Sequence, residues 1–336
     1  MIVDIPTGDD FKASGIDLLN LGWGILVDLL QKIEDAQNFY EWNICNESGE
    51  DKEDKDEALS QATAKYWEKA QRPLSTALSL IQQGTEFLLK GHIADISPYL
   101  LISGEPSSYP KKSHERDIRF SEFKTIDAQD LIRLYNTVSH SSKRLPESFQ
   151  RKFEDLRSKR NIVMHTVDSN LSLSIKDLFI SILEIHHYLS SELWVETRRS
   201  FIKNQPMSVM ADNLELYEYD KFDRVIYELN LEVSLVMKLL QSSETQKFFK
   251  FQKRQRSYIC PNCYSEAFEE TYVEAGAEMP ALAQLFPNEP NSTSVWCAVC
   301  NEVSKVARED CRDTDCLGNV IDESYGICLT CGASID

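Results

Sequence analysis

The feature that most constrains this chain of 336 residues is a set of cysteine pairs near its C-terminus. Eight of the nine cysteines form the pairs Cys260/Cys263, Cys297/Cys300, Cys311/Cys316 and Cys328/Cys331. A CxxC turn brings two thiolates to one tetrahedral ion, and a second turn completes a four-cysteine site. In a chain without an evident export signal, such spacing indicates metal ligands rather than disulfides. We therefore expect a double zinc-ribbon module at residues 257–336 that holds two structural Zn²⁺ ions.

The pattern leaves the pairing of the four turns open. Sequential pairing assigns the first four cysteines to one ion and the last four to the other, whereas the long interval between the first two turns also permits interleaving. No histidine lies in this region, and four thiolates leave no coordination position for a substrate. This disfavours a zinc-dependent hydrolase. Asn301 and Gly332 follow the second cysteine of their turns and suit a left-handed backbone there.

The first two hundred residues show the apolar spacing of helices. Apolar side chains recur every three or four positions from Phe11 to Phe39 and from Asp56 to Ile93, where Pro73 is expected to kink or divide the helix. Asp127, Pro146 and Ser174 mark further helix starts, and the last helix is expected to reach Trp194. The expected fold class is mostly α. A helical bundle over residues 1–204 precedes a helical connector over 205–256 and the zinc-ribbon module.

The charge of the chain is strongly negative but unevenly distributed. A net charge of −18 argues against a protein that coats nucleic acid with its whole surface. An acidic run within residues 46–58 predicts an exposed loop inserted in the bundle, whereas residues 143–160 and 247–256 are basic. Such a chain can bind a polyanion only at its local basic segments. No apolar run of about 20 residues and no leader peptide is evident, so we expect a cytoplasmic protein with no membrane partner.

One basic segment carries a candidate active site. Residues 157–165 are Arg-Ser-Lys-Arg-Asn-Ile-Val-Met-His. Asn161 directly follows Arg160, and on a helix it lies one turn before His165. Asn161 can orient the imidazole of His165, and the long side chain of Arg160 can reach a phosphate beside that ring. A group that moves protons next to a guanidinium that neutralises charge is what phosphodiester cleavage requires.

A second arginine and histidine show similar spacing. His140 follows Arg133 with six residues between them. Leu134 takes the place of the polar residue after the arginine, and the segment runs out of a short helix into a turn. We expect no catalytic role for this pair.

The Arg-Asn-x3-His pattern resembles the HEPN superfamily, whose nucleases carry R-x4-6-H with a polar residue after the arginine. Residues 84–101 are similar to the second core helix of that family, including an E-x3-K motif at Glu86 and Lys90. The resemblance covers about residues 12–203. It implies a helical bundle that forms a homodimer, in which two motifs meet, and that cuts RNA without a metal. By this resemblance His165 is the general acid or base, Arg160 clamps the phosphate, Asn161 orients the ring, and Glu86 and Lys90 support the site.

The function expected on this basis is that of a metal-independent endoribonuclease that cleaves RNA by attack of the ribose 2′-hydroxyl. The resemblance suggests a toxin or antiviral defence effector, whose restraint would call for an inhibitor or sensor partner. The alternative is a catalytically inactive module, in which the bundle mediates assembly and the ribbon binds protein or nucleic acid. The acidic balance favours the alternative, and the intact Arg160, Asn161 and His165 set in a basic segment favours the nuclease.

Overall fold

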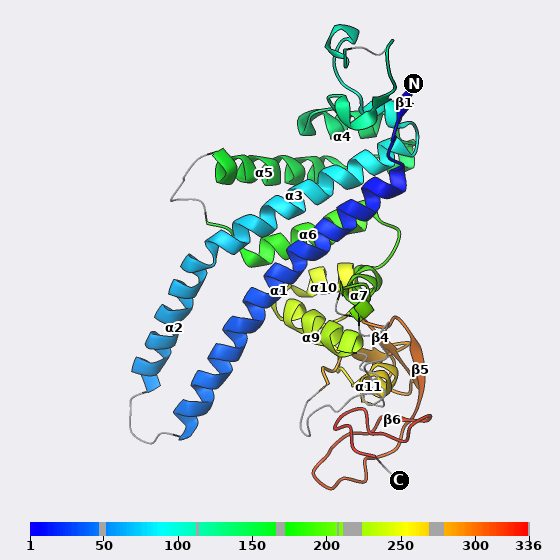
Figure 1. The fold of residues 1–336 in the computed structure, drawn as a ribbon. Helices are drawn as coiled ribbons and strands as arrows, with labels where there is room; N and C mark the ends of the chain where they lie inside the picture. Colours follow the sequence, from blue (N-terminus) through cyan, green and yellow to red (C-terminus); the bar gives the residue numbers. More distant parts are fainter. Residues whose placement is uncertain are drawn as a thin grey trace. The chain divides into compact units, whose positions relative to one another are not determined.

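The structure, a computed structural model, describes residues 1–46, 52–111, 114–165, 172–206, 208–210, 224–268 and 279–334. Within these residues the fold is mostly helical, with a few short strands (Figure 1). Contacts between residues divide the chain into a helical unit, Met1–Ser190, and a cysteine-rich unit, Ser191–Asp336. The predicted fold class, a helical bundle followed by a small cysteine-rich module, is confirmed.

The helical unit is built around one central helix. Its described helices are α1 (Gly8–Asn46), α2 (Lys52–Lys69), α3 (Gln71–Ala94), α4 (Ala128–Val138), α5 (Glu147–His165) and α6 (Ile175–Leu189). Helix α3 contacts α1, α4, α5 and α6. The short 3-10 helices are η1 (Pro98–Leu101), η2 (Pro106–Ser108), η3 (Phe120–Glu122) and η4 (Ser141–Lys143), and β1 (Ile2–Val3) pairs in parallel with β2 (Ile118–Arg119).

The core of the helical unit comes from the apolar stripes of α1, α3 and α6. Trp23 and Phe179 are fully buried and lie edge to face, with ring centroids 4.8 Å apart. Each such side chain contributes about 1.5–3 kcal/mol through removal of apolar surface from water. Aliphatic side chains of the three helices are also buried there: Leu19, Leu26, Leu78, Ile81, Leu88 and Ile182.

Small residues let α1 and α3 approach each other closely. Glycines of α1 face small residues of α3 in antiparallel order, at Gly8/Gly91, Gly15/Gly84 and Gly22/Ala77. A Cβ added at Gly84 would lie 2.9 Å from the carbonyl oxygen of Gly15. A Cβ at Gly91 would lie 2.8 Å from that of Gly8. Glycine is therefore required at these positions for backbone approach rather than for flexibility.

Several helix boundaries follow the sequence pattern. The helix expected from Phe11 to Phe39 is present and longer, and the one expected from Asp56 to Ile93 is divided at Ala70. Pro73 lies in the first turn of α3, where backbone N–H groups have no intrahelical acceptor and proline is tolerated. Ser174 caps α6, because its hydroxyl oxygen accepts a hydrogen bond of 3.3 Å from the backbone N–H of Asp177.

Two expectations about boundaries need correction. Helix α6 ends at Leu189 because Ser190 takes an extended conformation, so the helix does not continue to Trp194. The acidic run was expected to be a loop throughout. Residues 47–51 lie outside the described part of the chain, but α2 already begins at Lys52. Lysine and glutamate are good helix formers, so a run of charges without apolar anchors can still be helical.

The cysteine-rich unit combines short helices with a small sheet. Its described helices are α7 (Trp194–Lys203), α9 (Arg224–Leu239), α10 (Ser242–Phe249) and α11 (Pro261–Phe268). The strands β3 (Ala283–Leu285), β4 (Ser294–Cys297), β5 (Val303–Ala307) and β6 (Ile321–Asp322) form an antiparallel sheet in chain order.

Helix α7 belongs to the cysteine-rich unit by its contacts. It packs on α9, and the nearly buried side chains of Arg198 and Glu232 join the two helices through hydrogen bonds of 2.8 Å. The bundle was expected to extend to residue 204, whereas the contacts place the division after Ser190. The helix expected from Tyr217 to Leu240 appears as α9, and residues 217–223 lie outside the described part of the chain.

Helix α1 contains a long apolar segment. By length and composition its segment Gly8–Trp42 could cross a membrane, the one described helix of which this is true. Half of its most apolar window is buried inside the protein, and a core helix meets the same criterion. The expectation that no apolar stretch is long enough to cross a membrane is therefore corrected for this helix.

Candidate functional sites

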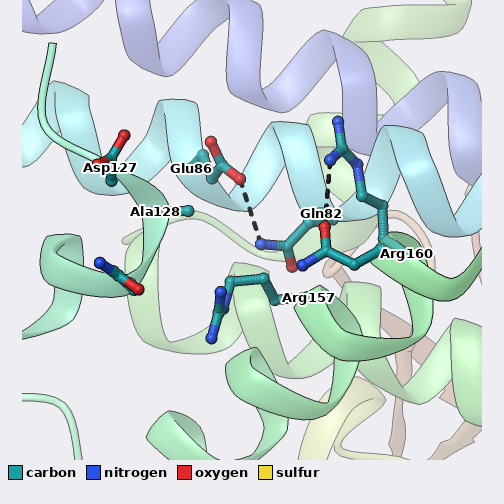
Figure 2. Close-up of a pocket in the computed structure, with 8 residues that line it drawn as sticks. Gln82, Glu86, Asp127, Ala128, Arg157 and Arg160 are labelled. Carbon is teal, nitrogen blue, oxygen red and sulfur yellow. Dashed lines mark hydrogen bonds between the residues drawn. The ribbon is translucent and has the colours of Figure 1, made fainter. Parts of the chain in front are cut away.

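An open hollow in the helical unit brings together three of the predicted site residues. It has a volume of about 260 Å³ and lies where α3, α5 and the start of α4 meet (Figure 2). Glu86 lines it from α3, and Arg160 and Asn161 line it from α5. These positions are far apart in sequence and meet because α3 packs against α5. The other lining residues are Gln82, Asp127, Ala128, Gln129 and Arg157.

Arg160 and Asn161 form a local pair within this hollow. Arg160 Nη1 donates a hydrogen bond of 3.3 Å to Asn161 Oδ1. Both side chains are half-buried. The amide therefore restricts the guanidinium at the edge of the hollow, where it can meet an anion. Figure 2 shows the Arg160 side chain beside Gln82.

His165 lies next to the hollow rather than inside it. It is the last residue of α5, its side chain is exposed, and it lines a second, shallower hollow. Arg157 and Asn161 line both hollows and so connect His165 with Arg160. Among the described residues no hydrogen bond joins Asn161 to the His165 ring, so the expected orienting contact stays a prediction.

The two residues of the E-x3-K motif have different surroundings. The Glu86 carboxylate accepts a hydrogen bond of 3.3 Å from Gln82 Nε2. Lys90 Nζ lies 5.8 Å from the centroid of the Phe87 ring and lines none of the hollows described here. Only Glu86 is thus placed to touch a ligand in the hollow.

Gln82 and Arg157 are two residues of the site that the sequence did not single out. Gln82 is 1% exposed, and its Oε1 has no hydrogen-bond partner among the described residues. Arg157 forms an ion pair of 2.7 Å with Glu154. Helical spacing could have indicated both, because Gln82 precedes Glu86, and Arg157 precedes Asn161, by one turn.

The second arginine and histidine pair has a different arrangement. Arg133 forms an ion pair of 2.9 Å with Asp130 on α4. His140 lies at the start of η4, where its Nδ1 is 2.9 Å from the Ser142 hydroxyl. Arg133 lines a third hollow, between α4 and α5, and His140 does not.

Two further histidines of the bundle, His186 and His92, have structural surroundings. His186 is 2% exposed, and burial lowers its pKa to about 4, so it is neutral at pH 7. His92 Nε2 lies 2.9 Å from the carbonyl oxygen of Leu189, and its ring is edge-on to Tyr135. These contacts tie α3 to α6 and α4.

The eight cysteines of the C-terminal region form two groups of four. The first cluster is Cys260, Cys263, Cys297 and Cys300, and the second cluster is Cys311, Cys316, Cys328 and Cys331. Within each cluster all Sγ atoms lie within 4.8 Å of one another. The structure thus supports sequential rather than interleaved pairing.

The sulfur spacing fits a tetrahedral metal ion. The distance is 3.6 Å between the Sγ atoms of Cys260 and Cys300, and 3.8 Å between those of Cys316 and Cys328. Four sulfurs at about 2.3 Å from one ion would lie about 3.8 Å from each other. A disulfide would bring two of them to about 2.05 Å. Each cluster could therefore hold one metal ion.

The local backbone supports thiolate ligands. The backbone N–H groups of Val299 and Gly318 each donate a hydrogen bond of 3.3 Å to a cluster sulfur. Asn301 and Gly332 have φ values of 61° and 76°, which confirms the left-handed backbone expected after the turns. These features are typical of turns that hold a metal between thiolates.

The two clusters differ in burial. The first has three buried cysteines, whereas the second has one buried member, Cys328, and an exposed one, Cys331. Hydrogen bonds among the crowded thiols, first with Cys260, together with burial raise the pKa of Cys263 well above its ordinary value. Four thiolates are therefore stable in the first cluster only beside a cation.

Comparison with protein-family models, with curated proteins and with solved structures gives no match for this chain.

Proposed function

We propose that this chain is a metal-independent endoribonuclease of the HEPN type, with its active site on α5. The observation that carries the proposal is the meeting of Arg160 and Asn161 with Glu86 in one hollow, with His165 one turn further along α5. This arrangement offers a cation for a phosphate and a titratable imidazole beside it. Lys90 would support the bundle behind the site.

The chemistry follows from these side chains. His165 removes the proton of the ribose 2′-hydroxyl, whose oxygen attacks the adjacent phosphorus. The bond from phosphorus to the 5′-oxygen breaks, and that oxygen takes up a proton from water, whose hydroxide is neutralised by the proton that His165 has taken. Arg160 stabilises the negative charge that builds on the phosphoryl oxygens. The products are a 2′,3′-cyclic phosphate and a 5′-hydroxyl.

The proposed active form is a symmetric homodimer. His165 is exposed at the end of α5, and each chain has one Arg160 and His165 motif. In the family that the chain resembles, two such motifs meet across the dimer interface, which would bring a second imidazole to the same phosphate. Light scattering tests this point. A monomer that retains nuclease activity would exclude the composite site.

The proposed cofactor is zinc, with one structural Zn²⁺ ion in each cysteine cluster. Four thiolates complete a tetrahedral shell and leave no position for water or substrate. The ions therefore stabilise the cysteine-rich unit and take no part in cleavage. The cysteine-rich unit would then recognise RNA or a regulatory partner, such as an inhibitor or a sensor.

We place the protein in the cytoplasm, as a toxin or antiviral effector whose activity must be restrained. The basic segment at residues 143–160 against a net charge of −18 supports a local RNA site on a chain that otherwise repels nucleic acid. The alternative is an inactive module for binding or assembly. The hydrogen bond that Asn161 Oδ1 accepts from Arg160 favours it, because the amide then contacts the guanidinium and not the His165 ring.

The decisive experiment uses RNA with one 2′-deoxyribose at the cleaved position. We expect cleavage at that position to stop while binding survives, because only the nucleophile is removed. Brief treatment with EDTA is expected to leave cleavage unchanged. Equal cleavage of RNA and DNA, or loss of activity with chelator that magnesium restores, would exclude this mechanism.

A further inference from the structure

Three hollows of the helical unit adjoin one another. The hollow of Arg160 and the hollow of His165 share Arg157 and Asn161. The third hollow shares Gln129 with the first and Glu154 with the second. The three hollows therefore border one another around the ion pair of Glu154 and Arg157, and we refer to them together as the groove.

The groove follows two helices. On α5 it is lined by Gln150, Glu154, Arg157, Ser158, Arg160, Asn161, Ile162 and His165. On α4 the lining residues include Gln129, Ile132, Arg133, Asn136 and Thr137. Both helices pack on α3, which provides Gln82 and Glu86. At 1.5 Å per residue, the α5 stretch is about 22 Å long from Gln150 to His165, enough for several nucleotides.

The charge of the groove is opposite in sign to that of the chain. Its lining includes Arg133, Arg144, Arg157 and Arg160 against the carboxylates of Glu86, Asp127 and Glu154. Arg157 is paired with Glu154, and Arg133 with Asp130. Among the described residues, Arg144 and Arg160 have no carboxylate partner. These two guanidiniums are available to phosphates at separate parts of the groove.

The position of Arg144 is set by the turn that carries it. The backbone N–H of Leu145 donates a hydrogen bond of 2.8 Å to Asn136 Oδ1. Asn136 Nδ2 donates to the carbonyl oxygen of Leu145 at 3.3 Å, and the Tyr135 hydroxyl donates to that of Lys143 at 3.1 Å. The turn is thus fixed to α4, so that Arg144 stays beside the groove.

The groove also offers groups for base edges. Gln82 Oε1 is buried beside the Arg160 hollow and accepts no hydrogen bond within the described part of the chain. An unsatisfied buried acceptor is unfavourable, and a base N–H group that reached it would relieve this cost. The amide of Gln129 lies on the shared border of two hollows. Such contacts require unpaired bases, which single-stranded RNA provides.

We propose that the groove between α4 and α5 binds a single strand of RNA that extends from the cleavage site at Arg160 and His165 to Arg133 and Arg144. The inference rests on the proposed nuclease function and names the substrate class for the same site. It gives Arg133, which we place outside catalysis, a role in holding the strand.

Binding of a fluorescent 2′-O-methyl RNA 12-mer, which cannot be cleaved, tests the groove separately from the chemistry. We expect Arg133→Glu and Arg144→Glu each to raise Kd about tenfold by fluorescence anisotropy. Arg133→Ala and Arg144→Ala are each expected to reduce the slope of log K against log salt by about 0.7. At saturating cleavable RNA the maximal rate stays near that of the wild type, so that only KM rises.

The matched control is Arg151→Glu. Arg151 is exposed on α5, pairs with Glu147 at 3.7 Å and lines none of the three hollows. We expect this variant to change Kd less than twofold. The thermal midpoints of the Arg133→Glu, Arg144→Glu and Arg151→Glu variants should agree closely, since surface ion pairs contribute little stability.

The outcomes separate this inference from the proposed nuclease. Equal RNA affinity of the wild type and the Arg133 and Arg144 variants, or no RNA binding at all, would overturn the proposed RNA-binding groove. The proposed nuclease activity would then still be tested by the cleavage assays. Equal affinity for duplex RNA would also overturn the groove. Selective weakening by the groove variants without any RNA cleavage would support the groove and reject the nuclease.

Discussion

The helical unit and the cysteine-rich unit are stabilised in different ways. In the helical unit, long helices bury side chains such as Trp23 and Phe179, and the candidate site lies on the surface of that core. In the cysteine-rich unit the described strands are two to five residues long, and Cys263 and Cys328 are themselves fully buried. Site and core are thus separable in the first unit, whereas in the second the cysteines of the two clusters are themselves part of the core.

Removal of one buried cysteine is the strongest test of this contrast. We expect Cys263→Ala to lower the zinc content from two ions per chain to one and to unfold the cysteine-rich unit locally, because a structural site is worth about 10 kcal/mol or more of binding energy. Elemental analysis and near-UV circular dichroism measure the two effects. Cys45→Ala, which removes the ninth cysteine, serves as the control and keeps both ions. A Cys263→Ala variant that still holds two ions would contradict the role of Cys263 as a metal ligand.

In the helical unit the corresponding changes are expected to leave the fold intact. His165→Ala and Arg160→Ala should each reduce RNA cleavage at least about 100-fold, the usual loss for an acid–base or charge-stabilising group. The thermal midpoint is expected to move by no more than about two degrees, since neither side chain belongs to the apolar core. His140→Ala is the control and keeps its activity. A greater loss of RNA cleavage in His140→Ala than in His165→Ala would show that His165 is not the catalytic histidine.

Packing rather than metal is expected to set the stability of the helical unit. Gly84→Ala places a Cβ against the carbonyl oxygen of Gly15. We expect it to lower the free energy of unfolding, measured with urea, by about 1–3 kcal/mol, because a clash with a backbone atom is not relieved by moving one side chain. At Gly22 the nearest atom, Ile81 Cγ1, would lie 3.3 Å away. Gly22→Ala is therefore neutral or stabilises by up to about 1 kcal/mol. A loss at Gly22 that equals the loss at Gly84 would argue against the close backbone contact.

The smallest expected effect distinguishes the two clusters. A chromogenic chelator should remove the ion of the second cluster a few times faster, because Cys331 is exposed while three ligands of the first cluster are buried. Cys331→Ser is expected to speed the fast phase only. A single release rate, or faster loss from the first cluster, would show that exposure of the ligands does not control release.

Parts of this structure could be predicted from local sequence. The Ser174 cap, the break before Pro73 and the cysteine turns each depend on residues a few positions apart. The Arg160 and Asn161 pair was found for the same reason, since a helix fixes its own spacing. The function of that pair is still a prediction.

Other parts depend on contacts that local patterns do not contain. The glycines at positions 15 and 84 matter only because α1 and α3 meet there. Apolar spacing continued past Leu189 because Trp194 is buried too, although it belongs to the other unit. Gln82 joins the site only through packing of α3 on α5. Periodicity indicates which face is buried, but not the partner that buries it.

Sequential pairing of the cysteines also has a consequence for biosynthesis. The first cluster is complete once residue 300 has emerged from the ribosome, and the second needs only residues 311–331. At about 5–20 residues per second, a few seconds separate the two completions. The first set of thiolates is therefore complete before the second set is made, so that one metal ion could bind before the other. Maturation can follow the order of synthesis, with the helical unit first, then one ion and then the other.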